Sequence, residues 1–266
     1  MKNIVQKDSQ QSTEVSLLPQ HPFVLPCCGA ISSGKTTLLV NMLTSKEFYK
    51  QQFNRIIFIS VTANLDEKIK EILECPDICV SNQKLQDAMD NQALQLDDYF
   101  QPTILPRYHG INEDDIHSEY LPEILRDLYA EQKFTISYFG KQISDKVLVC
   151  VDDAITSGIY RQGHSSEFAK FATSLRHVNC SVIHCSQLFK AIPKIIRTQS
   201  TAGVFCGIPN ELELKDVYEI FSCSLPLHKW SEYFNVIVNK PFQPIVFNLK
   251  NPRGYKMQRA FQEFVA

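Results

Sequence analysis

The chain has 266 residues, of which 44% are hydrophobic, 11% aromatic and 21% charged. This composition is typical of a globular protein and excludes a disordered, collagen-like or coiled-coil chain. The formal net charge is -2, so there is no overall basic field to hold nucleic acid, and any contact with DNA must be local. The nine cysteines follow no regular spacing, which indicates a reduced, intracellular protein without a disulfide framework.

The first 20 residues are rich in Gln and Ser and contain no aromatic residue. They predict a mobile N-terminal arm, and they lack the apolar stretch of a signal peptide. No window approaches the roughly 18 apolar residues that cross a bilayer, so we expect no transmembrane segment.

Apolar runs and helical patterns then alternate along the chain. A buried strand is expected from Phe23 to Cys28, a helix from Lys35 to Leu43 and a second buried strand from Arg55 to Ser60. A helix at 66–73 and a short strand at 78–80 follow. Residues 81–117 are polar and irregular, and we interpret them as a partly helical insertion.

The second half continues the alternation. We expect a helix at 121–133, a strand at 147–151, a helix at 166–176 and strands at 180–186 and 203–207. Asn210 is a candidate N-cap of the next helix, with Glu213 at the third helical position. The apolar runs 234–238 and 245–249 predict an edge hairpin.

This order predicts an α/β fold with a mostly parallel central sheet and helices on both faces. The domain organisation is then an arm at 1–20, a core at 21–210 that contains the insertion, and a C-terminal helix and β-rich extension of the same domain at 211–266.

The segment from Gly29 to Thr36 reads G-A-I-S-S-G-K-T and matches GxxxxGK[ST] between a predicted strand and a predicted helix. This is the pattern of a P-loop, whose backbone N–H groups and helix N-terminus bind phosphate. Lys35 is expected to reach the β- and γ-phosphates of ATP, and the Thr36 hydroxyl to bind Mg²⁺. The expected nucleotide-binding residues are Gly29, Ala30, Ile31, Ser32, Ser33, Gly34, Lys35, Thr36 and Thr37.

Five apolar residues lead into two carboxylates, Asp152 and Asp153, as in a Walker B strand. Asp152 is expected to hold Mg²⁺ together with Thr36, and Asp153 to orient and polarise the attacking water. The alternative is a pair of exposed capping aspartates. A third buried run ends at Gln187, whose amide is expected to enter the same crevice, either as a sensor of the γ-phosphate or as a plain strand-end amide. His184 in that run is interpreted as a core histidine.

These motifs resemble those of the genome-packaging ATPases of large eukaryotic DNA viruses and virophages, the poxvirus-type branch of the FtsK/HerA superfamily. The resemblance depends on the P-loop, the paired aspartates, the R-H-x-N that starts at Arg176, the strand that ends in Ser186-Gln187, and the I-P-x-x-I-R that ends at Arg197. It implies a RecA-like core of the additional-strand type, with the Gln187 strand between the P-loop strand and the Walker B strand.

The resemblance also implies partners and a place of action. It implies a homo-oligomeric ring, pentameric or hexameric, that threads double-stranded DNA into a preformed capsid, docked on a capsid vertex or on inner membrane proteins of the virion. The expected location is the virus assembly site in the cytoplasm of the infected host cell, or the virion itself. Basic residues for DNA occur only in patches: Lys190, Lys194 and Arg197, and Arg253, Lys256 and Arg259.

A ring ATPase also needs a cation for the charge that develops on the γ-phosphoryl group, often an arginine from the neighbouring subunit. Arg197 is our first candidate, because the family has an arginine in that segment. Arg176 is the competitor, although it also fits a helix C-terminal charge. Two other functions stay open: a nucleoside or nucleotide kinase, and a nucleotide-dependent switch without turnover.

Overall fold

The computed structural model describes residues 18–61, 79–80, 111–142, 144–153, 158–160, 165–207, 210–238, 243–251, 257–259 and 262–263. The helix that we predicted at 66–73 lies outside these residues, as do most of the N-terminal arm and residues 81–110 of the insertion.

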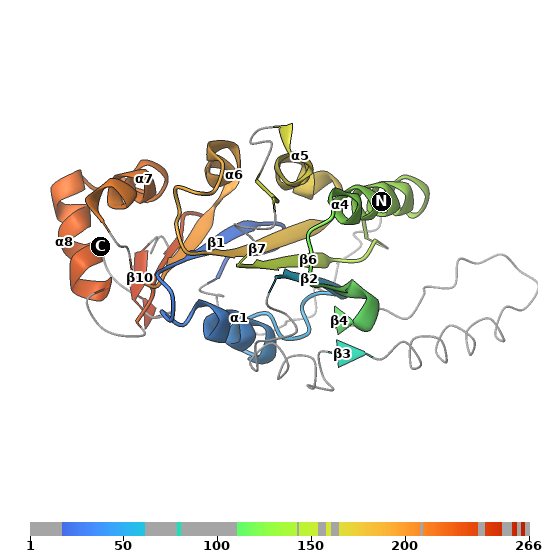
Figure 1. Ribbon diagram of the computed structural model, residues 1–266, viewed down its shortest axis with the longest axis horizontal. Coiled ribbons are helices and arrows are strands. Elements are labelled where there is room, and N and C mark those ends of the chain that lie inside the picture. Colours follow the sequence, from blue (N-terminus) through green and yellow to red (C-terminus); the bar gives the residue numbers. More distant parts are fainter. Residues whose placement is uncertain are drawn as a thin grey trace, which may run out of the picture.

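A twisted central sheet runs through the described part of the chain (Figure 1). Its strands follow one another in the order β11-β10-β9-β8-β1-β7-β6-β2-β5. Their bounds are β1 Val24–Cys28, β2 Arg55–Ser60, β5 Ile116–His117, β6 Val147–Asp152, β7 Cys180–Ser186, β8 Ala202–Phe205, β9 Ile245–Asn248, β10 Met257–Arg259 and β11 Gln262–Glu263. Two further short strands, β3 Cys79–Val80 and β4 Ile111–Asn112, pair with each other.

The strands from β5 to β8 along this order are parallel, and β9 joins the sheet antiparallel to β8. Strand β7 lies between β1 and β6, and its residues align with both neighbours. This is the strand order of an additional-strand RecA-like core, so the predicted fold class is confirmed.

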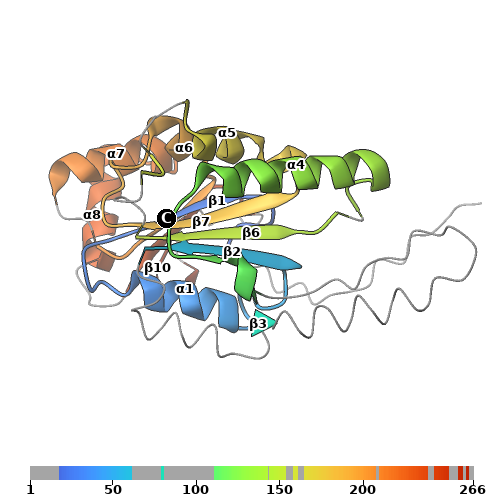
Figure 2. The same cartoon turned by 45° about the vertical axis from the view of Figure 1, so that its right-hand side comes forward.

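Helices cover both faces of the sheet (Figure 2). Helix α1, Lys35–Thr44, lies on one face. The other face is covered by α4 Pro122–Phe139, α5 Glu167–Ser174, α6 Lys194–Gln199 and α7 Glu211–Phe221, and α8 Leu227–Val238 packs into the same core at one end. Two short 3₁₀ turns complete the described elements, at Glu113–Asp115 and Leu175–His177.

The alternation of side chains along β6 explains why this strand reads as a continuous apolar run. Val147, Val149 and Val151 belong to the core under α4 and α5, whereas Leu148 and Cys150 belong to the core under α1. All five side chains are fully buried. A strand with a helix layer on each side has no solvent face, so its two carboxylates can only follow at its tip.

The C-terminal region differs from the prediction. The run 234–238 is not a strand but the end of α8. Two of its residues, Phe234 and Ile237, are buried on one side of that helix together with the preceding Trp230. Their spacing of four and three residues is helical, and the β-branched residues of the run concealed it. The second run forms β9 as expected and continues into β10 and β11.

The two irregular segments also contain more structure than we predicted. Residues 111–117, assigned to the insertion, form β4, a 3₁₀ turn and β5, and β5 pairs with β2 in the central sheet. Within the predicted mobile arm, Leu18 is 1% exposed, and the Tyr49 hydroxyl donates to the Pro19 carbonyl at 2.9 Å. The arm therefore does not extend to residue 20.

Candidate nucleotide-binding site

The loop between β1 and α1 has the backbone conformation of a phosphate-binding turn. Ser32 has a φ of 59° and Gly34 a φ of 93°, and α1 begins directly after Gly34. A Cβ at Gly29 would lie 2.6 Å from Ser33 Oγ and 2.9 Å from Cys206 Cβ, so only glycine fits there. The Ser33 hydroxyl is buried without a hydrogen-bond partner among the described residues.

Lys35, at the first position of α1, curls back over the loop. Its Nζ donates to the carbonyl oxygens of Gly29 at 2.9 Å and Ala30 at 2.8 Å. Both acceptors are neutral carbonyls, and phosphate oxygens are stronger acceptors for an ammonium group. The Lys35 ammonium group is therefore positioned to exchange these carbonyl oxygens for the oxygens of an anionic ligand.

Thr36 and Asp152 meet across the space between α1 and β6. The Thr36 hydroxyl donates to Asp152 Oδ2 at 3.1 Å. Burial raises the pKa of Asp152, and the hydrogen bond from Thr36 opposes that shift. A cation beside these two oxygens would offset the cost of burying the carboxylate, and hard oxygen donors of this kind are the ligands of Mg²⁺. The residues present thus fit the predicted metal.

Asp153 and Gln187 also meet, at the tips of β6 and β7. Gln187 Nε2 donates to Asp153 Oδ1 at 3.1 Å. Asp153 has a φ of 48°, in the left-handed region that an L-residue occupies only at a cost. This conformation turns the chain immediately after the buried Asp152, so two consecutive carboxylates have different surroundings.

The parallel register explains why these groups converge. Cys28 aligns with Ser186, and Ser60 aligns with Asp152, so β1, β7, β6 and β2 all end at one edge of the sheet. In open α/β sheets this carboxyl edge is where ligands bind. The structure therefore brings together Lys35, Thr36, Asp152, Asp153 and Gln187 as the sequence predicts.

Arg197 has partners within its own chain. Its side chain is 10% exposed and lies 3.2 Å from Asp216 Oδ1, with the guanidinium 5.3 Å from the centre of the Phe189 ring. To reach a neighbouring subunit, it would have to leave both. Arg176 is exposed in the 3₁₀ turn before β7, and its carbonyl accepts a hydrogen bond from Lys141.

The basic patch that we predicted for DNA contact is partly neutralised. Lys194 Nζ lies 2.6 Å from Glu219 Oε1, and Arg197 is paired with Asp216, both on α7. Lys190 is exposed and is the member of this patch without an ion pair among the described residues. The side chains of the second patch, Arg253, Lys256 and Arg259, lie outside the described part of the structure.

His184 is a core residue, as predicted. It is fully buried between α5 and the sheet, where its ring packs edge-on against Phe168. Burial lowers the pKa of His184 to about 3, so the imidazole is neutral. A neutral ring behind the site adds no charge to it.

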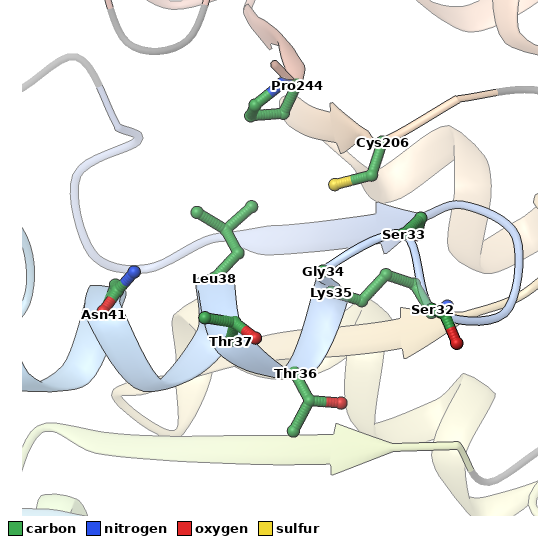
Figure 3. Close-up of a pocket in the computed structure, with 10 residues that line it drawn as sticks. All are labelled: Ser32, Ser33, Gly34, Lys35, Thr36, Thr37, Leu38, Asn41, Cys206 and Pro244. Carbon is green, nitrogen blue, oxygen red and sulfur yellow. The ribbon is translucent and has the colours of Figure 1, made fainter. Parts of the chain in front are cut away.

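A hollow of about 650 Å³ begins at the P-loop and extends along α1 (Figure 3). Four of its lining residues were not among our predicted site residues: Leu38, Asn41, Cys206 and Pro244. A sequence signal existed for two of them, because Leu38 and Asn41 follow Gly34, the N-cap of α1, at helical spacing. Cys206 and Pro244 come from the ends of β8 and β9, and only the folded sheet brings them near the loop.

The fold has counterparts among solved structures. It resembles the genome packaging NTPase B204 from Sulfolobus turreted icosahedral virus 2 in complex with ATP-gammaS, with a TM-score of 0.55 and 12% identity over 92% of this chain and 100% of that one. The complexes of the same protein with AMP and with sulfate match at TM-scores of 0.55, with 12% and 13% identity over 91% and 93% of this chain and 98% and 99% of those. No family model and no curated protein matches.

At this identity the likeness concerns the fold, which is that of a P-loop NTPase. Among the described helices, none combines the length and the apolar character that a membrane span requires.

Proposed function

We propose that this protein is a Mg²⁺-dependent ATPase whose hydrolysis of ATP drives double-stranded DNA into a preformed capsid. The observation that carries the ATPase is the convergence of Lys35, the Thr36–Asp152 pair and the Asp153–Gln187 pair at one edge of the sheet. In this assignment each of these residues has its own role in nucleotide binding or hydrolysis. Each role can therefore be tested by substituting that residue alone.

The residues would act as follows. The loop N–H groups and Lys35 bind the phosphates, with Lys35 exchanging its two carbonyl acceptors for phosphate oxygens. Thr36 and Asp152 hold Mg²⁺, which neutralises charge on the phosphates. Asp153 accepts a proton from the attacking water, and Gln187 fixes the orientation of that carboxylate through its hydrogen bond.

The packaging role is supported by the fold and by the function of its structural counterpart, a viral genome packaging NTPase. The proposal includes a homo-oligomeric ring of five or six subunits, docked on a capsid vertex or on inner membrane proteins of the virion. It places the protein at the virus assembly site in the host cytoplasm, or in the virion.

A ring offers a neighbour's arginine to each γ-phosphate. Arg176 is exposed, whereas Arg197 is paired with Asp216, so Arg176 now becomes the better candidate for the arginine that acts on the neighbouring subunit. Subunits with Arg176→Ala should bind ATP but hydrolyse it slowly. Mixing them with Lys35→Ala subunits should restore turnover at interfaces that combine an intact P-loop with an intact arginine. The same mixture made with Arg197→Ala tests the alternative.

One assay tests the function as a whole. Phosphate release from ATP should require Mg²⁺ and should increase when double-stranded DNA is added. Transfer of the γ-phosphate to a deoxynucleoside would instead identify a kinase, and tight ATP binding without phosphate release would identify a switch. Turnover that DNA does not affect would contradict the motor but not the ATPase.

A further inference from the structure

The hollow beside the P-loop has two chemically different ends (Figure 3). At one end lie the loop residues and Lys35, which suit phosphate. At the other end, Leu38 on α1 faces Pro244, which precedes β9, and Asn41 lies beyond Leu38 along the helix. A rise of about 1.5 Å per residue places Asn41 roughly 7.5 Å farther along α1 than Thr36. The hollow thus leads away from the phosphates by about the length of a sugar.

Asn41 is the polar residue in an otherwise apolar stretch of α1, Leu38 to Leu43. Its neighbours Leu39, Val40, Met42 and Leu43 are buried, whereas Asn41 is exposed to the hollow. Asparagine is a poor residue inside a helix, because its amide competes for backbone groups. No described residue forms a hydrogen bond with the Asn41 side chain, so within the described part of the chain its donor and its acceptor are both available to a ligand.

We propose that Asn41 reads the nucleobase and makes the site selective for adenine, with Leu38 and Pro244 holding the flat faces of the ring. This inference rests on the proposed function, since it assumes a nucleotide with its phosphates on the P-loop. An asparagine amide offers a donor and an acceptor side by side. That pair matches the N6 donor and N7 acceptor of adenine, whereas guanine presents two acceptors, O6 and N7, at the same edge.

The position of Pro244 gives the C-terminal extension a role in the same site. Pro244 leads into β9, which pairs antiparallel with β8, and Cys206 follows β8 on the same side of the hollow. One wall of the base pocket therefore comes from the P-loop helix and the other from the extension. A proline ring adds an apolar wall without a backbone donor that would compete for the base.

The test is a comparison of ATP and GTP binding to the full-length protein in Mg²⁺, by calorimetry or by displacement of a fluorescent nucleotide. The wild type should bind ATP about tenfold or more tightly than GTP, the range expected of one bidentate contact. Asn41→Leu should bring the two affinities within about twofold. Asn41→Asp has no donor for N7 or O6, so it should weaken both ligands, but its carboxylate can still accept from N6 of adenine, so ATP should stay preferred.

Asn235→Asp is the matched control, because Asn235 is an exposed asparagine on α8, outside the lining of this hollow. It adds the same charge and should leave both affinities unchanged. Wild-type selectivity that survives in Asn41→Leu would overturn the role of Asn41 and leave the ATPase intact. A wild type that binds neither nucleotide would overturn the proposed function, and this inference with it.

Discussion

Polar side chains lie at both ends of β7, but their hydrogen bonding differs. At the amino end, His21, Asn179 and Ser181 form a closed network: His21 contacts Ser181 Oγ at 2.7 Å and Asn179 Oδ1 at 3.0 Å. Asn179 Nδ2 donates to two backbone carbonyls, and the Phe23 N–H donates to Ser181 Oγ. At the carboxyl end, Asp152 is buried with one hydroxyl donor, and Lys35 holds carbonyl oxygens that phosphate can replace.

Each end also contains a residue with a left-handed backbone, Asn179 at φ 52° and Asp153 at φ 48°. Asn179 uses both halves of its amide within the fold, so its conformation is stabilised locally. Asp153 accepts one side-chain hydrogen bond, from Gln187. The difference teaches that the amino end of β7 is closed by its own hydrogen bonds, whereas the carboxyl end keeps carboxylate oxygens that a ligand can use.

The largest effect should come from the carboxyl end. Lys35→Ala should lower ATP turnover by about 10³-fold, because the developing charge loses a preorganised cation. The thermal midpoint should change little, since the two bonds that Lys35 donates in the free protein go to loop carbonyls. Lys215→Ala, an exposed lysine on α7, is the control and should behave as wild type. Full turnover in Lys35→Ala would mean that the loop has only a structural role.

The next effect separates the two aspartates. Asp153→Asn should slow hydrolysis by about 10²- to 10⁴-fold, the usual contribution of a general base, while nucleotide affinity stays within a few-fold of wild type. Asp152→Asn should instead weaken the Mg²⁺ dependence of nucleotide binding. Asp127→Asn on the exposed side of α4 controls for the loss of one charge. Equal losses of binding in both site variants would show that the two acids share one task.

At the amino end we expect stability to change and activity to remain. Ser181→Ala leaves the buried Phe23 N–H without its acceptor and His21 Nδ1 without its partner, so the free energy of unfolding should fall by about 1–3 kcal/mol. Urea denaturation measures this loss. Ser137→Ala, an exposed serine on α4, should stay within about 0.5 kcal/mol of wild type. A large loss of ATP turnover per folded molecule in Ser181→Ala would show that the amino end of β7 also contributes to catalysis, and would contradict this comparison.

A further effect is a dependence of stability on pH. Burial lowers the pKa of His21 below 6.5, and it lowers the pKa of His184 from 6.5 to about 3. Between the lower folded values and 6.5 the unfolded chain binds more protons, so stability falls as pH falls, by up to about 1.4 kcal/mol per pH unit for each histidine. Urea midpoints should be level above pH 7 and decline below it. His21→Asn should flatten part of that slope, and an unchanged slope would remove His21 as a cause.

Local patterns were sufficient for much of the core. The strands at 55–60 and 180–186 have the predicted bounds, and the P-loop lies between a strand and a helix as its motif requires. These features depend on residues that are close in sequence: a run of apolar side chains, or glycines at fixed spacing before a lysine. The convergence of Asp152, Asp153 and Gln187 also follows, because parallel strands end at one edge.

Contacts between distant segments decided the rest. The helical state of 234–238 depends on packing against the aromatic core of Phe205 and Phe247, which overrides the β-propensity of the run. The sequence does not show that Arg197 has an ion-pair partner. Only the position of α7 in the folded structure shows that Asp216 pairs with it. The far wall of the hollow is brought to α1 by the pairing of β8 with β9. Sequence periodicity shows which face of an element is apolar, but the partner of that face is set by the chain's long-range packing.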